Sequence, residues 1–144
     1  MPGPFIVGYD GSPAATRALE FAVTQAAAAG LGIVLVHVLE WSPYSFLSRE
    51  ELEERHMRRK EELARAEVAV LAPAMDRMKD RGVAITPVIR YGHSAEILSD
   101  CARDEAASQI IVGRDGAGGL SARIFGSTAA TLVQIAPVPC TIVP

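Results

Sequence analysis

Short apolar segments alternate with helical segments along the whole 144-residue chain, and this alternation constrains the fold more than any other feature. Each apolar run is bounded by turn residues and has the length of a buried strand. The helical segments between them are long enough for right-handed crossovers between parallel strands. The chain is therefore predicted to be an α/β protein with an open, doubly wound, five-stranded parallel sheet and helices on both faces. The expected strands are 5–10, 33–39, 83–90, 109–113 and 140–143, and the expected helices are 13–29, 49–81, 94–107 and 127–135.

Size and composition exclude several classes of protein. A chain of 144 residues has the length of one domain, expected to span residues 1–144. The net charge is -3 and no basic tract is present, so nucleic acid is not an expected partner. No apolar run approaches the ~18 residues of a membrane span, and the start of the chain lacks a basic signal region. Cys101 and Cys140 fit neither a metal-ligand spacing nor a redox motif. We therefore expect a cytoplasmic protein that binds neither nucleic acid nor membrane.

Residues 49–81 differ in character from the rest of the chain, because they hold nine basic and nine acidic residues. This composition predicts a helix with a large solvated face. An inward seam is expected in its second half, where apolar residues recur at spacings of 4, 3, 4 and 3, and Pro73 is expected to kink the helix. The seam residues are Ala64, Val68, Leu71, Met75 and Met78.

The expected ligand position follows from the fold class. In doubly wound sheets, ligands lie beyond the carboxyl ends of the strands where the strand order reverses. With strands numbered along the chain and ordered 3-2-1-4-5, this point lies between the first and the fourth, which are followed by residues 10–12 and 113–116. Residue 113 also opens a glycine-rich stretch that reaches Gly126, directly before a helix beginning at Ser127. Glycine backbone and a helix N-terminus both favour phosphate, so this stretch is a candidate phosphate cradle.

Other interpretations of these residues are weaker. The stretch is not a Walker loop, which needs lysine where Ser127 follows Gly126, nor a dinucleotide fingerprint, which follows the first strand. A glycine-rich loop without a ligand is the plain alternative. His37 lies in a central strand and is interpreted as a hydrogen-bonded core histidine. Asp10 lacks the second aspartate expected of a phosphoryl acceptor, because Ser12 stands two residues later.

The spacing Gly113-x2-Gly116-x9-Gly126-Ser127 resembles the ATP-binding signature of the universal stress protein family. Segments 6–12, 36–38, 92–97, 109–113 and 137–143 also resemble that family, in the same order along the chain. The resemblance implies a Rossmann-like, adenine nucleotide alpha hydrolase-like sheet of order 3-2-1-4-5. It also implies a homodimer and membership of the ATP-binding branch.

The resemblance further implies a set of nucleotide contacts. Asp10 would face the ribose hydroxyls, and the main chain of Val38 would lie near the adenine. Glycines at the loop start would let the backbone approach the nucleotide, and the residues at the loop end would hold phosphate oxygens. The expected contact residues are Gly8, Tyr9, Asp10, Val38, Gly113, Arg114, Gly116, Gly126, Ser127 and Thr128. The expected ligand is ATP, ADP or AMP, with Mg²⁺ bound through the phosphates rather than by protein ligands.

Arg114, Asp115 and Ala117 depart from the family pattern, and an acid so close to the phosphates either weakens triphosphate binding or helps to hold a metal. The predicted function is an adenine nucleotide-dependent stress-response or regulatory module that acts through an unidentified protein partner. Slow hydrolysis at most is expected, because the loop offers no phosphate-cradling lysine and no catalytic residue is evident. The alternatives are a dimeric scaffold that does not bind ATP and a nucleotide-dependent hydrolase or transferase. The dimer is expected to form through the final strand, 140–143.

Overall fold

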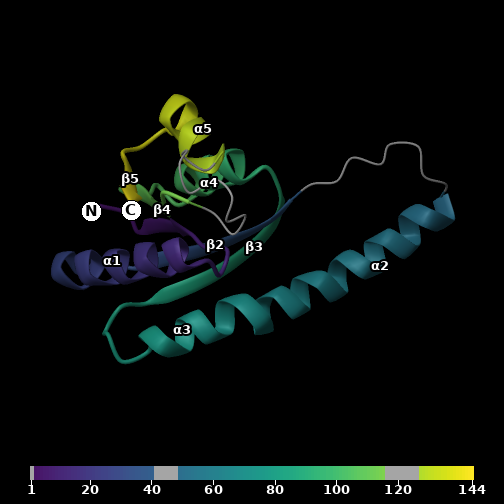
Figure 1. Cartoon of the computed structure of the whole chain (residues 1–144), viewed down its shortest axis with the longest axis horizontal. Helices are drawn as coiled ribbons and strands as arrows, with labels where there is room; N and C mark the ends of the chain where they lie inside the picture. Colours follow the sequence, from purple (N-terminus) through teal and green to yellow (C-terminus); the bar gives the residue numbers. More distant parts are fainter. Residues whose placement is uncertain (1, 41–48, 116–126) are drawn as a thin grey trace.

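The computed structural model describes residues 2–40, 49–115 and 127–144. Five parallel strands form one sheet in the order β3-β2-β1-β4-β5 (Figure 1). The predicted class, the parallel pairing and the strand order are confirmed. The strands are Phe5–Gly8 (β1), Ile33–Glu40 (β2), Ile85–Gly92 (β3), Gln109–Gly113 (β4) and Cys140–Val143 (β5).

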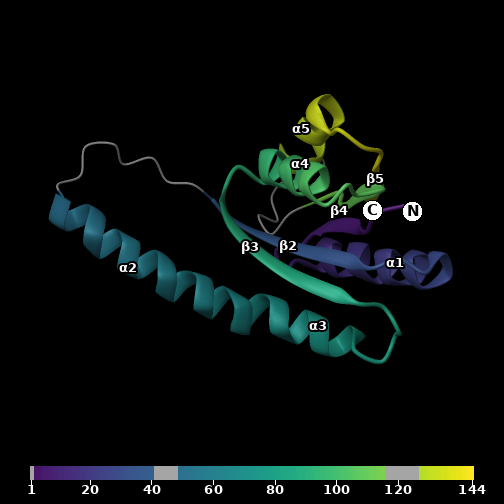
Figure 2. The ribbon, with the colours of Figure 1, turned by 180° about the vertical axis from the view of Figure 1, so that it is seen from behind.

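Helices cover both faces of the sheet. In Figures 1 and 2, α1 and α3 lie on one face and α4 and α5 on the other, while α2 extends away from the sheet. Among the described residues, no helix combines the length and the apolar character needed to cross a membrane. The helices are Pro13–Ala29 (α1), Arg49–Ala66 (α2), Ala72–Met78 (α3), Ser94–Asp104 (α4) and Ser127–Ile135 (α5), with a π-helical turn, Glu67–Leu71 (η1), between α2 and α3.

Two apolar cores lie on the two faces of the sheet. Along β1, Val7 packs into the core beneath α1 and α3, and its neighbour Ile6 packs into the core beneath α4 and α5. Ile111 and Ile110 divide between the same two cores on β4. Successive strand residues point to opposite faces, so a strand covered on both sides must be apolar at nearly every position.

The start of α1 is stabilised by the residues predicted to begin it. Ser12 Oγ accepts a hydrogen bond from the Ala15 N–H at 3.1 Å, and Pro13 occupies the first helical position. The helix ends at Gly30, whose φ of 68° lies in the left-handed region. A side-chain cap of this kind contributes about 1 kcal/mol.

The inward seam of the long charged segment differs from the prediction in its first half. Leu71 and Met78 are buried as expected, and Met75 is half-buried. Ala64 is exposed, however, and Val68 has 72% of its surface accessible. The predicted seam is therefore correct after residue 70 and wrong before it.

The π-helical turn explains this change of phase. In η1 the Ala72 N–H bonds to the Glu67 carbonyl, five residues back, so the turn holds one more residue than an α-helical turn. Pro73 follows directly; it cannot donate a helical hydrogen bond and its ring crowds the preceding turn, which the extra residue relieves. The structure thus has a π-turn shortly before Pro73, where the sequence predicted a kink. The inward residues are Leu63, Ala66 and Val70 before the shift, and Leu71, Ala74 and Met78 after it.

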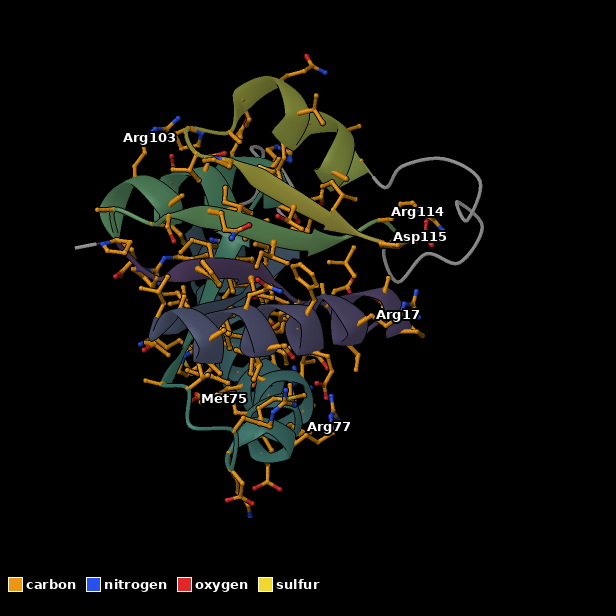
Figure 3. The ribbon with its side chains drawn as sticks, turned by 90° about the vertical axis from the view of Figure 1, so that its left-hand side faces the viewer. Arg17, Met75, Arg77, Arg103, Arg114 and Asp115 are labelled. Carbon is orange, nitrogen blue, oxygen red and sulfur yellow. The ribbon has the colours of Figure 1, made fainter. Side chains whose placement is uncertain are left out.

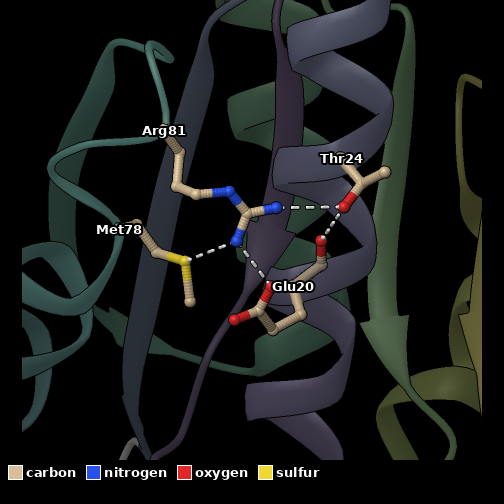
Figure 4. A network of polar contacts seen from close by, with 4 residues as sticks. All are labelled: Glu20, Thr24, Met78 and Arg81. Carbon is tan, nitrogen blue, oxygen red and sulfur yellow. Dashed lines mark hydrogen bonds and ion pairs between the residues drawn. The ribbon is translucent and has the colours of Figure 1, made fainter.

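Polar contacts tie the long helical segment to the rest of the fold. Arg81 donates to Glu20 Oε2 at 2.8 Å and to Thr24 Oγ1 at 3.1 Å, both on α1 (Figure 4). On β3, the Tyr91 hydroxyl donates to Glu62, and the guanidinium of Arg59 lies 5.2 Å from the centre of the Tyr91 ring. These contacts are exposed, so they orient the helices more than they stabilise the fold.

Candidate functional site

The end of β1 is held from several sides through Tyr9. Its N–H donates to the Val36 carbonyl at 2.8 Å, and its carbonyl accepts a hydrogen bond from Nδ1 of His37 at 2.8 Å. The buried phenol accepts a hydrogen bond from Arg77 of α3 at 3.0 Å. His37 is therefore the hydrogen-bonded core histidine that the sequence predicted. Tyr9 fixes the direction in which the chain leaves the sheet.

Asp10 follows at the carboxyl edge of the sheet. Its side chain is exposed, and Oδ1 accepts a hydrogen bond from the Ser12 N–H at 2.9 Å. Gly11, between them, has a φ of 81°, which a residue with a side chain rarely adopts. The turn therefore presents a carboxylate beside the first turn of α1, with its orientation set by the backbone.

The two glycines that end β1 and β4 have tight surroundings. A Cβ on Gly113 would lie 2.8 Å from the carbonyl carbon of Ala14, because the first turn of α1 passes directly against the end of β4. A Cβ on Gly8 would lie 3.1 Å from methyl groups of Leu98 and Val112. Both glycines thus have a packing reason that is independent of any ligand.

The structure brings several predicted site residues to one edge of the sheet. β1 and β4 are direct neighbours, paired from Phe5↔Gln109 to Val7↔Ile111, so their ends meet where the strand order reverses. Val38 lies further along β2, opposite Arg90 of β3. Gly116 and Gly126, like Ala117, lie outside the described residues.

The chain beyond β4 begins with two charged residues. Arg114 is exposed, and its N–H donates to the Val143 carbonyl of β5 at 2.8 Å. Asp115 is half-buried, and Figure 3 shows both residues near the end of β4, on the same side of the molecule as Arg17. On α5, Ser127 is the first helical residue and is exposed, and Thr128 is half-buried.

Two arginines that the sequence analysis did not single out make contacts near this edge of the sheet. Arg77 reaches Tyr9 from α3, and the Nε of Arg17 on α1 donates to the Pro144 carbonyl at 3.0 Å. Arg77 lies in a run of alternating charges, where nothing in the sequence separates it from its solvated neighbours. Within the described parts of the chain, no three His, Cys, Asp or Glu side chains gather as a metal site would require.

A separate groove of about 490 Å³ lies near the start of β3. It is largely apolar, and two of its charged residues, Asp76 and Lys79, form an ion pair at 3.4 Å. The groove is thus remote from the carboxyl edge, where polar groups converge. Its lining is Glu67, Ala72, Met75, Asp76, Met78, Lys79, Val83, Ile85 and Pro87.

Comparison with known sequences finds relatives among the universal stress proteins. A protein of Thermus aquaticus, "Universal stress protein in QAH/OAS sulfhydrylase 3'region", is 32% identical over 144 residues, covering 96% of each chain. A universal stress protein of Mycobacterium tuberculosis is 29% identical over 136 residues, covering 94% of this chain but 43% of its own length. The chain therefore spans less than half of that mycobacterial relative.

Comparison with solved structures shows the same fold. The universal stress protein UspA of Lactobacillus plantarum has a TM-score of 0.83 at 21% identity, covering 99% of this chain and 97% of its own. A universal stress protein in complex with cAMP has a TM-score of 0.70 at 22% identity, covering 99% and 97%. One from Archaeoglobus fulgidus in complex with dAMP has a TM-score of 0.68 at 21% identity, covering 99% and 98%.

The family assignment rests on the whole length of the chain. The sequence profile of the universal stress protein family matches residues 1–144. The strand order, the parallel sheet and the relative from Thermus aquaticus agree with that match. This chain belongs to the universal stress protein family.

Proposed function

We propose that this chain binds an adenine nucleotide at the carboxyl edge where β1 and β4 end, and that it acts as a nucleotide-dependent stress-response or regulatory protein. One observation carries the proposal: an exposed carboxylate, Asp10, is held in place by Ser12 at the point where the strand order reverses. Ligands of doubly wound sheets lie at this point. A carboxylate there is suited to accept hydrogen bonds from ribose hydroxyls.

The remaining contacts follow from the resemblance to the family. The main chain of Val38 would contact adenine, and the backbone at Gly113 would lie beside the sugar. Phosphates would lie toward the start of α5, where Ser127 and Thr128 supply hydroxyls and the free N–H groups of a helix start favour anions. Mg²⁺ would bind through the phosphates. The cAMP and dAMP complexes of two structural neighbours support an adenine ligand.

Slow turnover at most is proposed for any bound ATP. Fast phosphoryl transfer needs a positioned base and cationic clamps around the phosphates. The chain has only two lysines, Lys60 and Lys79, and both belong to the charged segment 49–81. The nucleotide would then act through the conformation or the partners of the protein.

Adenine nucleotide is expected to stabilise the fold. At a concentration 100 times the Kd, binding contributes about 2.7 kcal/mol, which corresponds to a rise in Tm of roughly 5–10 °C. Asp10→Asn keeps an acceptor for the Ser12 N–H but removes the charge that faces the ribose, so its Tm should rise less. Differential scanning fluorimetry with AMP, ADP and ATP measures both effects.

Asp80→Asn is the matched control, because it removes the same charge from an exposed position in the turn that follows α3. Its Tm should rise with nucleotide as the wild type does. A wild-type Tm unchanged by millimolar AMP, ADP and ATP would contradict nucleotide binding and favour the alternative of a scaffold.

A second copy of the chain is the proposed partner of β5, which is an edge strand. The carbonyls of Pro139 and Val143 accept hydrogen bonds from the β4 side. Backbone groups alternate in direction along a strand, so the N–H and C=O groups of Cys140 and Ile142 face outward. An unpaired edge of this kind is a template for another strand. Two exposed apolar residues of α5, Val133 at 78% and Ile135 at 39%, favour an interface on this side of the molecule.

Light scattering should find twice the chain mass of 15.3 kDa. Ile142→Pro removes an outward N–H while sparing the pairing with β4, and we expect it to give a folded monomer. Ile142→Val keeps the N–H and should remain a dimer. A monomeric wild type at micromolar concentration, or a dimeric proline variant, would contradict pairing through β5.

A further inference from the structure

Asp115 carries a buried carboxylate oxygen without a partner. Oδ1 is inaccessible to solvent, and no residue in the described ranges donates a hydrogen bond to it. A buried acceptor without a donor is unfavourable, because it has lost its hydrogen bonds to water and no protein group replaces them. In native proteins such groups are few, and each one calls for an explanation.

Asp115 follows the end of β4, so its carboxylate belongs to the same edge of the sheet as the proposed nucleotide site. Asp115 is two residues beyond Gly113, a distance that an extended chain spans in about 7 Å. Gly113 itself lies against Ala14, in the first turn of α1. The same turn is preceded by Asp10, so two carboxylates flank the edge where β1 and β4 end.

A carboxylate interacts differently with the two ends of a nucleotide. A nucleoside carries hydroxyl and amino groups, which donate hydrogen bonds to a carboxylate. Phosphate oxygens at neutral pH are acceptors and carry negative charge, so the negative charge of a nearby carboxylate repels them. Each added phosphate increases the repulsion, while the nucleoside contacts stay the same.

We infer that Asp115 makes the site selective for adenine nucleotides with few phosphates, so that AMP binds more tightly than uncomplexed ATP. This inference rests on the proposed function, because it concerns which nucleotide the same site accepts. Asp115 acts in it as a specificity-determining residue. The exposed Arg114 beside it offsets part of the charge but supplies no hydrogen bond to the buried oxygen.

Isothermal titration calorimetry with AMP, ADP and ATP in the presence of EDTA tests the inference. For the wild type, affinity should fall from AMP to ADP to ATP. Asp115→Asn keeps the shape of the side chain and removes its charge, so affinity for ATP should rise about tenfold while affinity for AMP changes less than about threefold. Asp115→Glu keeps the negative charge, so it should keep the wild-type preference for AMP. Asp80→Asn should leave the ratio of the ATP affinity to the AMP affinity unchanged.

The ratio of the ATP affinity to the AMP affinity shows whether Asp115 determines selectivity or only supports the fold. A change in folding would alter the affinity for all three nucleotides together. Wild-type protein that binds ATP as tightly as AMP, or an Asp115→Asn variant with an unchanged ratio, would overturn the inference and leave nucleotide binding standing. Wild-type protein that binds none of the three would overturn the proposed function as well.

Discussion

Gly113→Ala is expected to destabilise the fold by about 3 kcal/mol, because the new methyl group has no room. It would lie 2.8 Å from the carbonyl carbon of Ala14 and 2.9 Å from the Ala14 oxygen and Cβ. These are mostly backbone atoms of the first turn of α1, so relief requires the helix to move away from β4. Thermal unfolding should show a Tm lower by about 10 °C.

Gly82→Ala is the control that separates steric crowding at residue 113 from the general effect of replacing a glycine by alanine. Gly82 has a φ of 75° and no atom within 4 Å of a Cβ built there, so alanine meets only backbone strain. That strain costs about 1 kcal/mol. Equal losses of stability in the two variants would show that β4 and α1 are less tightly packed than the structure indicates.

Gly113 illustrates what a sequence motif can and cannot tell. The resemblance assigns this glycine to the approach of a nucleotide, and the structure gives it a second, independent reason, because a Cβ there would clash with Ala14 of α1. A spacing of glycines does not reveal which atoms lie against them. A binding defect in a Gly113 variant would therefore carry little information about the ligand, and Asp10→Asn is the better probe.

The strands and most helices were predictable because their signals are local. Ser12, Pro13 and Gly30 mark the two ends of α1, which is observed at Pro13–Ala29 as predicted. The apolar runs mark strands because the sheet is covered on both faces. The sheet order follows from the resemblance to the family, since strand pairing depends on contacts between distant segments.

Tertiary contacts account for what sequence reasoning missed. The hydrogen bond from Arg77 to Tyr9 joins residues 68 positions apart, and no local pattern indicates it. The buried oxygen of Asp115 depends on packing that the sequence does not encode locally. Asp10 directly follows a buried strand at a turn, and the structure shows its carboxylate exposed there.

The inward seam of the long helical segment shows the limit of periodicity most directly. The regular spacing from Ala64 to Met78 assumes an unbroken α-helix, and one extra residue in η1 rotates the preceding residues away from the core. Val68 and Leu71 belong to the same predicted seam but have opposite environments, with accessibilities of 72% and 0%. Substituting each of them by alanine therefore tests the π-turn itself.

Leu71→Ala is expected to cost about 3 kcal/mol, because it removes a fully buried side chain from the core beneath α1 and leaves a cavity. Val68→Ala should change stability by less than about 0.5 kcal/mol, since the side chain lies in water and alanine is the better helix former. Urea unfolding followed by circular dichroism measures both changes, and the slope of the transition should stay the same. Similar losses in the two variants would mean that the helix passes through residues 67–71 without the extra residue, with Val68 and Leu71 both facing the sheet.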